Sequence, residues 1–290
     1  MLNILVTGSN GQLGNEIRQL APAFKDYHFI FTDVAELDIT KKTTVAGFVS
    51  HHANDVIINA AAYTAVDKAE TEPEIADLIN GTAVGNLASA ARKYNALLVH
   101  VSTDYVFNGK AHQPINEDDP TAPDGAYARS KLLGEQLILQ ENSKAIILRT
   151  SWLYSEFGGN FVKSMLKYGR EREKLNVVFD QIGSPTYARD LARVILELIP
   201  KWREYKTPEV FHYSNEGVAS WFDFTKAIHE IAGISCKVLP IETKDYPLPA
   251  KRPFYCVMNK DKIKKEFNIE IPYWRDSLKE CIGRIEKKAQ

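Results

Sequence analysis

The stretch 2-LNILVTGSNGQLG-14 decides the fold of this chain. An apolar run over residues 2–7 leads directly into three glycines, Gly8, Gly11 and Gly14, and a helical pattern begins at Gln12. Glycine allows the sharp turn that a strand-to-helix loop needs, and it lets a diphosphate approach the amide groups at the helix start. Because the glycines lie between a first strand and a first helix, the stretch predicts the opening unit of a dinucleotide-binding fold.

Outward from this loop, apolar strand-like runs alternate with helical patterns. The predicted strands, dense in Val, Ile, Leu and Phe, cover residues 2–7, 28–33, 56–61, 97–103 and 145–154. The predicted helices between them cover residues 12–24, 41–53, 72–95 and 126–141. Strands buried on both faces and joined by helices require right-handed crossovers and a parallel sheet. The sequence therefore predicts an α/β fold with a doubly wound, Rossmann-type parallel sheet.

The alternation loosens after Tyr154. We expect residues 1–155 to form the dinucleotide-binding domain, with segments near 177–202 rejoining it. Residues 156–290 become richer in Pro and aromatic side chains, as in 240-PIETKDYPLPAKRPF-254. They are predicted to form mainly a smaller α/β lobe that binds substrate over the carboxyl edge of the sheet, where ligands of such sheets bind.

Composition limits the classes of function. A net charge of -1 gives no general attraction to nucleic acid or to an anionic membrane, and no apolar run reaches the length of a membrane span. The three cysteines have no metal-ligand spacing, and His51 and His52 have no ligand partner nearby. The N-terminus runs into glycines without a basic region, so no signal peptide is expected. These features predict a cytoplasmic protein without a metal site.

Several side chains could select the dinucleotide. Asp33 ends the second predicted strand, where a carboxylate hydrogen-bonds the ribose diol of NAD and disfavours a 2′-phosphate. Neither 9-SN-10 nor 34-VAE-36 offers a cation for that phosphate, so the local sequence favours NADH. The loop residues that could meet the diphosphate are Gly8, Asn10, Gly11, Gln12, Leu13 and Gly14. Candidates for the adenine and for a flat cofactor bed are Asp38, Ile39, Ala60, Ala61 and Ala62.

A candidate catalytic group combines a strand end with the helix that follows it. The strand over 97–103 ends in the hydroxyl of Thr103, and Tyr127 and Lys131 share one face of the helix predicted over 126–141. The Y-x-x-x-K spacing alone is weak evidence, because about one such pair is expected by chance in this composition. A hydride delivered to a carbonyl carbon requires a proton on its oxygen, which a phenol can supply. We expect the nearby ammonium of Lys131 to lower the pKa of the Tyr127 phenol by favouring the phenolate. Lys131 could also hydrogen-bond the nicotinamide ribose.

At these residues the chain resembles the extended short-chain dehydrogenases/reductases, and among them the dTDP-4-dehydrorhamnose reductase family. The resemblance covers almost the whole chain. It rests on the motifs TGSNGQLG (7–14), NAAAYTAVDKAE (59–70), VSTDYVFNG (101–109), YARSK (127–131), RTSWLY (149–154), DQIGSPT (180–186) and KRPFYCVMNKDKIKKEFNIEIPYWRDSL (251–278). Of these, STDYVF and NAAAYTAVDKAE are far more specific than the glycine or Y-x-x-x-K spacings.

The resemblance implies a function and a set of residues. It implies reduction of the C4 ketone of a dTDP-6-deoxy-4-keto-hexose by NADPH or NADH, with Thr103, Tyr127 and Lys131 as a catalytic triad. The side chains that it places near the substrate are Thr103, Asp104, Val106, Phe107, Trp152 and Arg252, the last at the diphosphate. Trp152 could instead be a core residue, and Arg252 a surface charge.

Alternatives remain open at this point. One is another nucleotide-sugar short-chain reductase or an epimerase; a dehydratase is disfavoured because no Glu follows Asp104. Another is a non-catalytic, dinucleotide-binding regulatory subunit of the same fold. Some relatives are described as dimers that share Mg²⁺ between carboxylates. Here Arg189 opens a helix and the terminus is basic, so we expect a monomer or a homodimer without that metal.

Overall fold

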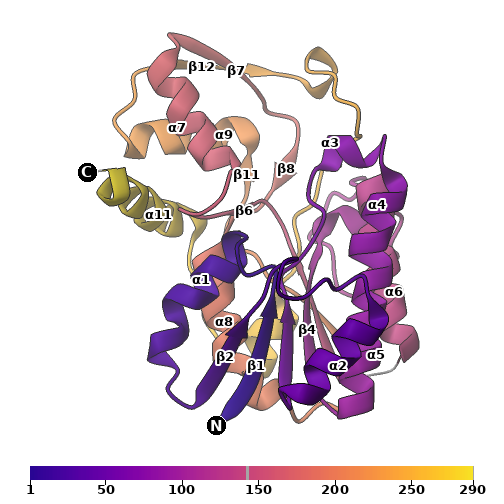
Figure 1. Cartoon of the computed structure of the whole chain (residues 1–290). Helices are drawn as coiled ribbons and strands as arrows, with labels where there is room; N and C mark the ends of the chain where they lie inside the picture. The colour runs from indigo at the N-terminus through magenta and orange to yellow at the C-terminus, as the bar shows by residue number, and fades with distance from the viewer. Residues whose placement is uncertain (142–143, 290) are drawn as a thin grey trace.

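The computed structural model describes residues 1–141 and 144–289, which form a parallel sheet with a smaller lobe above one of its edges (Figure 1). The sheet runs in the order β10-β5-β4-β3-β1-β2. Its strands, all parallel to their neighbours, are β1 (Leu2–Thr7), β2 (Tyr27–Phe31), β3 (Val56–Asn59), β4 (Leu97–Thr103), β5 (Ala145–Thr150) and β10 (Glu209–His212). The predicted doubly wound parallel sheet is therefore confirmed.

Helices cover both faces of the sheet because successive side chains of each strand point to opposite faces. On β1, Ile4 and Val6 pack toward α1 (Gln12–Leu20) and α8 (Ala188–Trp202), whereas Leu5 packs on the other side. That other face is covered by α2 (Lys42–His51), α5 (Ala83–Tyr94) and α6 (Ala126–Glu141). Short helical segments complete this part of the chain: η1 (Ala21–Ala23), α3 (Val66–Ala69), α4 (Pro73–Asp77), η2 (Leu78–Thr82) and η3 (Asp104–Val106).

The order of the strands reverses between β1 and β3. The chain proceeds from β1 outward to β2, then returns past β1 to β3 and continues in the opposite direction. The loops that leave β1 and β3 at their carboxyl ends therefore diverge, and such a point opens the crevice in which ligands of this architecture bind. The glycine loop follows β1 at this point, and 60-AAA-62 follows β3.

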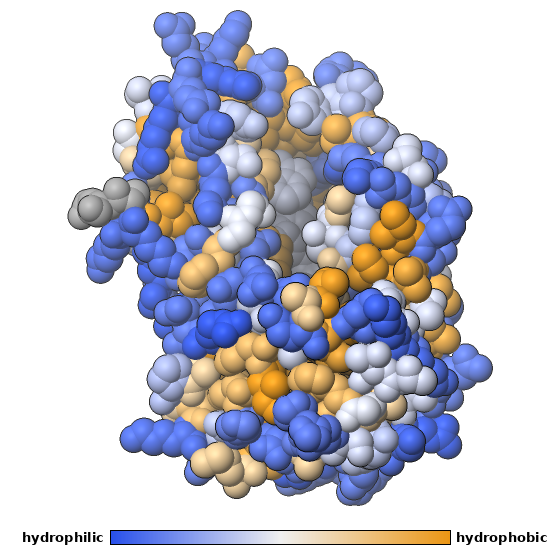
Figure 2. Space-filling view, viewed as in Figure 1, coloured by the Kyte–Doolittle hydropathy of each residue, from blue (hydrophilic) through white to orange (hydrophobic). Residues whose placement is uncertain are grey.

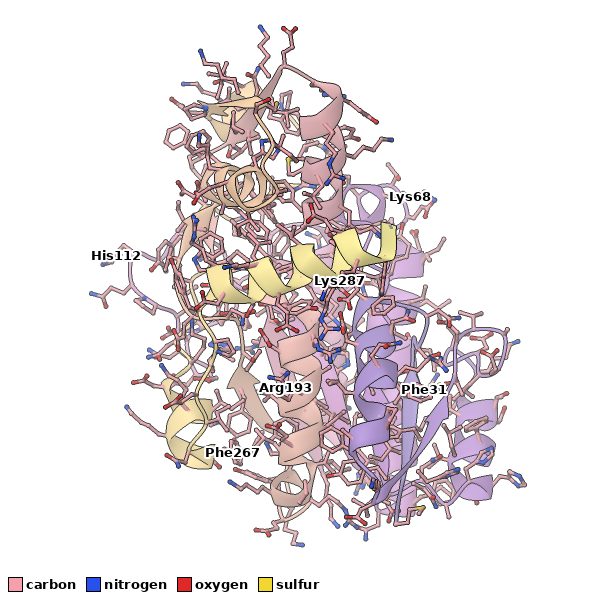
Figure 3. The ribbon with its side chains drawn as sticks, turned by 90° about the vertical axis from the view of Figure 1, so that its left-hand side faces the viewer. Phe31, Lys68, His112, Arg193, Phe267 and Lys287 are labelled. Carbon is pink, nitrogen blue, oxygen red and sulfur yellow. The ribbon has the colours of Figure 1, made fainter. Side chains whose placement is uncertain are left out.

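The smaller lobe has its own core around Phe224, built from short strands and three main helices. Its elements are β6 (Leu153–Tyr154), α7 (Phe161–Glu171), β7 (Lys174–Val178), β8 (Ile182–Gly183), β9 (Thr186–Tyr187), β11 (Ala219–Ser220), α9 (Trp221–Ile231), β12 (Lys237–Ile241), η4 (Thr243–Asp245) and α11 (Trp274–Ala289). Helix α11 lies across the ends of α1 and α8, between these two helices and the rest of the lobe (Figure 3). Helix α10 (Asp261–Phe267) packs beside β10 at the sheet.

Several predicted elements differ from the structure. The strand expected over 145–154 divides at Trp152, whose backbone is left-handed (φ +47°), so that β6 leaves the sheet and pairs with β9. The helix expected over 72–95 contains a π-helical turn over η2. In the segment expected to rejoin the sheet near 177–202, α8 does pack on it, but β7 pairs with β12 in the small lobe. Conversely, β10 adds a sixth strand to the sheet from within the range assigned to the lobe.

Across residues 1–141 and 144–289, none of the helices has both the length and the apolar character that a membrane crossing requires.

Candidate active site

The glycine loop is held by close packing against the loop after β3. Gly8 has a left-handed backbone (φ +64°), and a Cβ there would lie 2.6 Å from Cα of Ala61. A Cβ on Gly14 would lie 2.5 Å from Cα of Ser9, within the same turn. Two of the three glycines are thus required by backbone packing, which leaves the exposed Gly11 at the surface of the turn.

The start of α1 suits an anion. No side chain caps this terminus among the described residues, and its first turn contains no acidic residue. Unpaired amide groups and the helix dipole at such a terminus attract phosphate oxygens. The side chains of Gln12 and Leu13 are used elsewhere, because Gln12 Oε1 accepts a hydrogen bond from Asn160 Nδ2 (3.0 Å) and Leu13 is in the core. The terminus therefore fits a dinucleotide diphosphate through its backbone.

Asp33 lies beside this loop at the end of β2. Its carboxylate accepts hydrogen bonds from the backbone amides of Asn10 (3.1 Å) and Val34 (2.9 Å). A cation that sequence reasoning missed lies nearby: Arg18 donates to Ser9 Oγ (3.1 Å), and its guanidinium lies 4.2 Å from the centre of the Phe31 ring. The sequence pattern that could have identified Arg18 is its helical spacing, because it lies one turn after Gly14 in the predicted helix.

The other predicted cofactor contacts have structural partners of their own. Asp38 accepts hydrogen bonds from the hydroxyl (2.6 Å) and the amide of Thr40, and Ile39 lies in the core beneath α2 and α5. The three alanines after β3 are half-buried, and Ala61 donates its amide to Asn59 Oδ1 (3.2 Å). Ala60, Ala61 and Ala62 lie where the strand order reverses, whereas Asp38 and Ile39 lie in the segment that leads into α2.

We expect Gly14→Ala to impair both folding and dinucleotide binding. The new methyl group would overlap backbone atoms of Ser9 and Gly8, which cannot rotate away, so the loop must shift. Such overpacking costs about 1–3 kcal/mol of unfolding free energy, and we expect dinucleotide affinity to fall at least ~10-fold. Urea unfolding and a fluorescence titration with NADPH measure the two effects.

Gly47→Ala is the matched control for that change. Gly47 is exposed on α2, and a Cβ there meets nothing within 4 Å. Replacing a helical glycine by alanine stabilises by roughly 0.5–1 kcal/mol, so this variant should gain stability and bind NADPH as the parent does. Unchanged NADPH affinity in Gly14→Ala would contradict a role of the glycine loop in binding.

The catalytic candidates meet where β4 ends and α6 begins. Thr103, the last residue of β4, donates its hydroxyl to Asp104 Oδ1 (3.1 Å) and accepts the amide of Tyr105 (3.2 Å). Asp104 is buried, and its Oδ2 has no hydrogen-bond partner among the described residues. Burial raises the pKa of Asp104 to about 7, although the Thr103 hydroxyl partly offsets this effect. A buried carboxyl group thus lies beside a threonine hydroxyl at the carboxyl end of β4.

Tyr127 lies in the first turn of α6, which a distant carboxylate caps. Glu70 Oε1 accepts a hydrogen bond from the amide of Ala126 (2.7 Å), and its charge favours a helix N-terminus. The Tyr127 ring packs edge-on against Tyr105, with ring centres 5.7 Å apart. Burial raises the pKa of Tyr127 to about 12, with a smaller opposing effect of Thr103. The phenol therefore keeps its proton at neutral pH, as a proton donor must.

Lys131 is buried one turn further along α6. Its ammonium donates to the carbonyl of Val101 (2.7 Å), and Nζ lies 3.4 Å from His100 Nε2. Burial lowers the pKa of Lys131 to about 8, while Glu135 partly opposes that shift. The expectation that the ammonium lowers the pKa of Tyr127 is not met in this arrangement, because Lys131 is directed to β4 and burial dominates the phenol.

A cavity of about 620 Å³ opens beside these groups (Figure 2). The space-filling view shows a hollow between the small lobe and the side of the molecule that carries α3 and α4. Aromatic residues in its wall are Tyr105, Phe107, Phe161, Trp221, Tyr246 and Phe254, and cationic ones are Lys110, Lys251 and Arg252. Tyr105, which lines the cavity, packs edge-on against Tyr127, so one aromatic side chain lies between the cavity and the catalytic candidates, which do not line it themselves.

The predicted substrate residues divide between this cavity and the core. Phe107 and Arg252 line the cavity, but Arg252 is already paired with Asp67, with Nη1–Oδ1 and Nη2–Oδ2 distances of 2.9 and 2.7 Å. Val106 is fully buried. Trp152 stacks on Trp221 with ring centres 3.6 Å apart, so Trp221, which sequence reasoning missed, presents the aromatic face to the cavity.

Arg189, expected to oppose a metal at the start of α8, forms ion pairs instead. Its guanidinium lies 3.4 Å from Glu16 and 3.6 Å from Glu280, which belong to α1 and α11. Over the described part of the chain, no group of three or more His, Cys, Asp or Glu side chains could hold a metal ion.

Comparison with known proteins assigns the chain to a family. The family model described as "RmlD substrate binding domain" matches residues 2–287. The chain is similar to the spore coat polysaccharide biosynthesis protein SpsK of Bacillus subtilis (41% identity, covering 97% of each chain). It is also similar to the dTDP-4-dehydrorhamnose reductase of Aggregatibacter actinomycetemcomitans (41% identity, 96% of this chain and 98% of the relative).

A solved structure extends this agreement to three dimensions. The dTDP-4-dehydrorhamnose reductase of Bacillus anthracis in complex with NADP superposes with a TM-score of 0.92 at 38% identity, covering 98% of this chain and 100% of that one. The similarity runs through both the sheet and the small lobe, and it confirms the resemblance that the motifs indicated. The chain belongs to the RmlD substrate-binding-domain family, the family of the dTDP-4-dehydrorhamnose reductases.

Proposed function

We propose that this chain reduces the C4 ketone of dTDP-4-dehydro-6-deoxy-L-mannose, dTDP-4-dehydrorhamnose, to dTDP-L-rhamnose with NADPH or NADH. The observation that carries the proposal is that Thr103 ends β4 and Tyr127 and Lys131 lie on successive turns of α6, while Tyr105 connects Tyr127 to a cavity lined by aromatic and cationic side chains. Membership in a family whose relatives are dTDP-4-dehydrorhamnose reductases supports the same reaction.

In this mechanism Tyr127 is the general acid. A bound reduced nicotinamide supplies the hydride that reaches the ketone carbon. Tyr127 then donates its proton to the ketone oxygen, and the raised pKa of the phenol ensures that the proton is present at neutral pH. Thr103 is suited to orient that oxygen, since its hydroxyl can turn from Asp104 toward a substrate acceptor. Lys131, buried beneath, is proposed to contact the nicotinamide ribose.

The two parts of the chain are proposed to divide the ligands. The sheet with its glycine loop would bind the dinucleotide through the amides of α1 and the carboxylate of Asp33. The small lobe would bind the dTDP-sugar, with Phe107, Trp221 and the stacked Trp152 around the apolar part. Arg252 would meet the diphosphate only by exchanging part of its pairing with Asp67, because both of its terminal nitrogens are engaged there.

The preference between the two reduced dinucleotides is set by opposing charges. Asp33 repels a 2′-phosphate, whereas Arg18 lies against Ser9 on the neighbouring turn and offers a cation. We therefore propose that both NADH and NADPH are used. A cytoplasmic location, where nucleotide sugars and reduced nicotinamides are available, fits this reaction, and the protein is proposed to act as a monomer or a homodimer.

Turnover with dTDP-4-dehydrorhamnose, followed by loss of cofactor absorbance with NADH and NADPH in parallel, tests the function. The expected result is oxidation of the cofactor that depends on the sugar, with dTDP-L-rhamnose identified by mass spectrometry. Light scattering of the same preparation gives the oligomeric state. Binding of either dinucleotide without turnover would instead support a non-catalytic, dinucleotide-binding subunit. Turnover of UDP-4-keto sugars but not the dTDP sugar would assign a different nucleotide-sugar reductase.

A further inference from the structure

A buried row of hydrogen-bonded side chains connects the first strand to the catalytic helix. Thr7 Oγ1 donates to Asn59 Oδ1 (2.7 Å), Asn59 Nδ2 lies 3.0 Å from His100 Nδ1, and His100 Nε2 lies 3.4 Å from Lys131 Nζ. These four residues come from β1, β3, β4 and α6, and none is more than 2% exposed. Because these side chains are shielded from water, each of their hydrogen-bond donors and acceptors needs a partner within the protein.

The backbone fixes the direction of these hydrogen bonds. The amide of Ala61 donates to Asn59 Oδ1 (3.2 Å), and a backbone N–H cannot act as an acceptor. The Thr7 hydroxyl donates to the same oxygen. The oxygen of the Asn59 amide must therefore face Ala61 and Thr7, and its NH₂ group must face His100. It follows that His100 Nδ1 accepts a hydrogen bond.

This acceptor role fixes the tautomer of the imidazole. Burial lowers the pKa of His100 well below 6.5, and the charge of Lys131 adds to this effect, so the ring is neutral. A neutral ring with an accepting Nδ1 carries its hydrogen on Nε2. That N–H is directed at Lys131 Nζ, which has a lone pair to accept it as a neutral amine but none as an ammonium.

We propose that His100 is a positioning residue whose Nε2–H opposes the ammonium form of Lys131, so that Lys131 can gain and release a proton in the working pH range. The proposal rests on the proposed function, in which Lys131 acts beside Tyr127. Each reduction removes one proton from the Tyr127 hydroxyl, and solvent must return it before the next turnover. A lysine that exchanges its proton near neutral pH suits this return better than a permanently charged one.

The other groups around Lys131 leave His100 as the residue that decides the balance. Glu135, one turn further along α6, favours the ammonium, but its carboxylate is shared with Arg149 of β5. Tyr127 keeps its proton and is neutral, and Asp104 in η3 is half-ionised near neutrality. The carbonyl of Val101 accepts from either form of the lysine. Burial lowers the pKa of Lys131 to about 8, and a donor placed against its nitrogen would act in the same direction.

The tautomer can be observed without any turnover, which separates this inference from the proposed reaction. The full chain labelled with ¹⁵N-histidine is followed by long-range ¹H–¹⁵N correlation from about pH 6 to about pH 9, across the ordinary range of histidine titration. His100 is assigned by the loss of its signals in His100→Asn or His100→Gln. We expect a lone pair on Nδ1 and a hydrogen on Nε2 throughout. The opposite tautomer, or an imidazolium, would overturn the proposal.

The pH profile of kcat/KM tests the effect on Lys131. The wild type is expected to lose activity on the alkaline side near the pKa of Lys131, about 8. In His100→Gln the amide oxygen can accept a hydrogen bond from the ammonium. The alkaline limb of the pH profile should therefore move to higher pH by about one unit or more. His212→Gln, which replaces another fully buried histidine, is the matched control and should leave the limb where it is. If His100→Gln lowered activity equally at every pH and left the alkaline limb in place, His100 would have only a packing role.

Discussion

Tyr127→Phe is expected to lower kcat at least ~10²-fold while the dissociation constant of NADPH stays within about twofold of the parent value. The substitution removes the only atom of the side chain that can donate the proton, and it leaves the ring that packs edge-on against Tyr105. Thr103 is the one side chain that affects the pKa of the phenol through a hydrogen bond within the described residues, and it lies at the same site. Stopped-flow reduction of the dTDP-4-keto sugar and a fluorescence titration with NADPH separate the chemical step from binding.

The control for this variant is Tyr154→Phe. Tyr154 is a fully buried phenol, stacked on Tyr187 in the small lobe, and its hydroxyl has no partner among the described residues. Its removal should leave kcat within about twofold of the parent, because no charge or proton is involved. If Tyr127→Phe turned over the ketone at the rate of this control, Tyr127 would not be the general acid.

Glu135→Gln is expected to lower the free energy of unfolding by about 3–5 kcal/mol, the largest stability effect that we predict. Glu135 accepts three hydrogen bonds from Arg149, one from Nη2 (2.8 Å) and two from Nε (3.1 and 3.3 Å), and it also accepts from the Ser102 hydroxyl. Both partners are almost fully buried, so removal of the carboxylate charge leaves a buried guanidinium without its bidentate partner. Urea unfolding followed by circular dichroism measures the loss.

The double variant Glu135→Gln/Arg149→Met distinguishes an unpaired charge from lost packing. Replacing both members of a buried ion pair by neutral groups is often close to neutral for stability, so the double variant should recover most of the loss. If the single and double variants were equally unstable, the contribution of Glu135 would come from shape and from Ser102 rather than from Arg149. Turnover of the double variant also tests whether the ion pair aligns α6 with the end of β4.

Sequence patterns were sufficient to predict the elements that carry the candidate site. The alternation of apolar runs predicted five of the sheet strands and placed the glycine loop after the first of them. The spacing of Tyr127 and Lys131 gained weight only from its place after the strand that ends at Thr103. The family resemblance came from longer motifs, above all STDYVF and NAAAYTAVDKAE. The comparisons confirm the fold and the family, whereas the roles of the individual site residues stay predictions until variants are measured.

What the sequence did not reveal depends on partners far apart in the chain. Glu70 caps α6 across 56 residues, and His100 approaches Lys131 across 31. Neither pairing has a periodic signal, because each arises from parallel strands and helices brought together by crossovers. The division of the strand at Trp152 was hidden for another reason: a left-handed backbone at a bulky residue costs about 1–3 kcal/mol, and only the surrounding packing against Trp221 explains why it is held.

The addition of β10 and α8 to the sheet has a consequence for how the molecule could be divided. The chain leaves the sheet after β5, builds part of the small lobe, returns as α8 and β10, and then leaves again for α9. A fragment ending at residue 155 would lack the strand beside β5 and the helix that covers Ile4, Val6 and Val99. Because of this interleaved path we expect the two lobes to unfold as one cooperative unit, so limited proteolysis should yield intact protein or small peptides rather than a stable half.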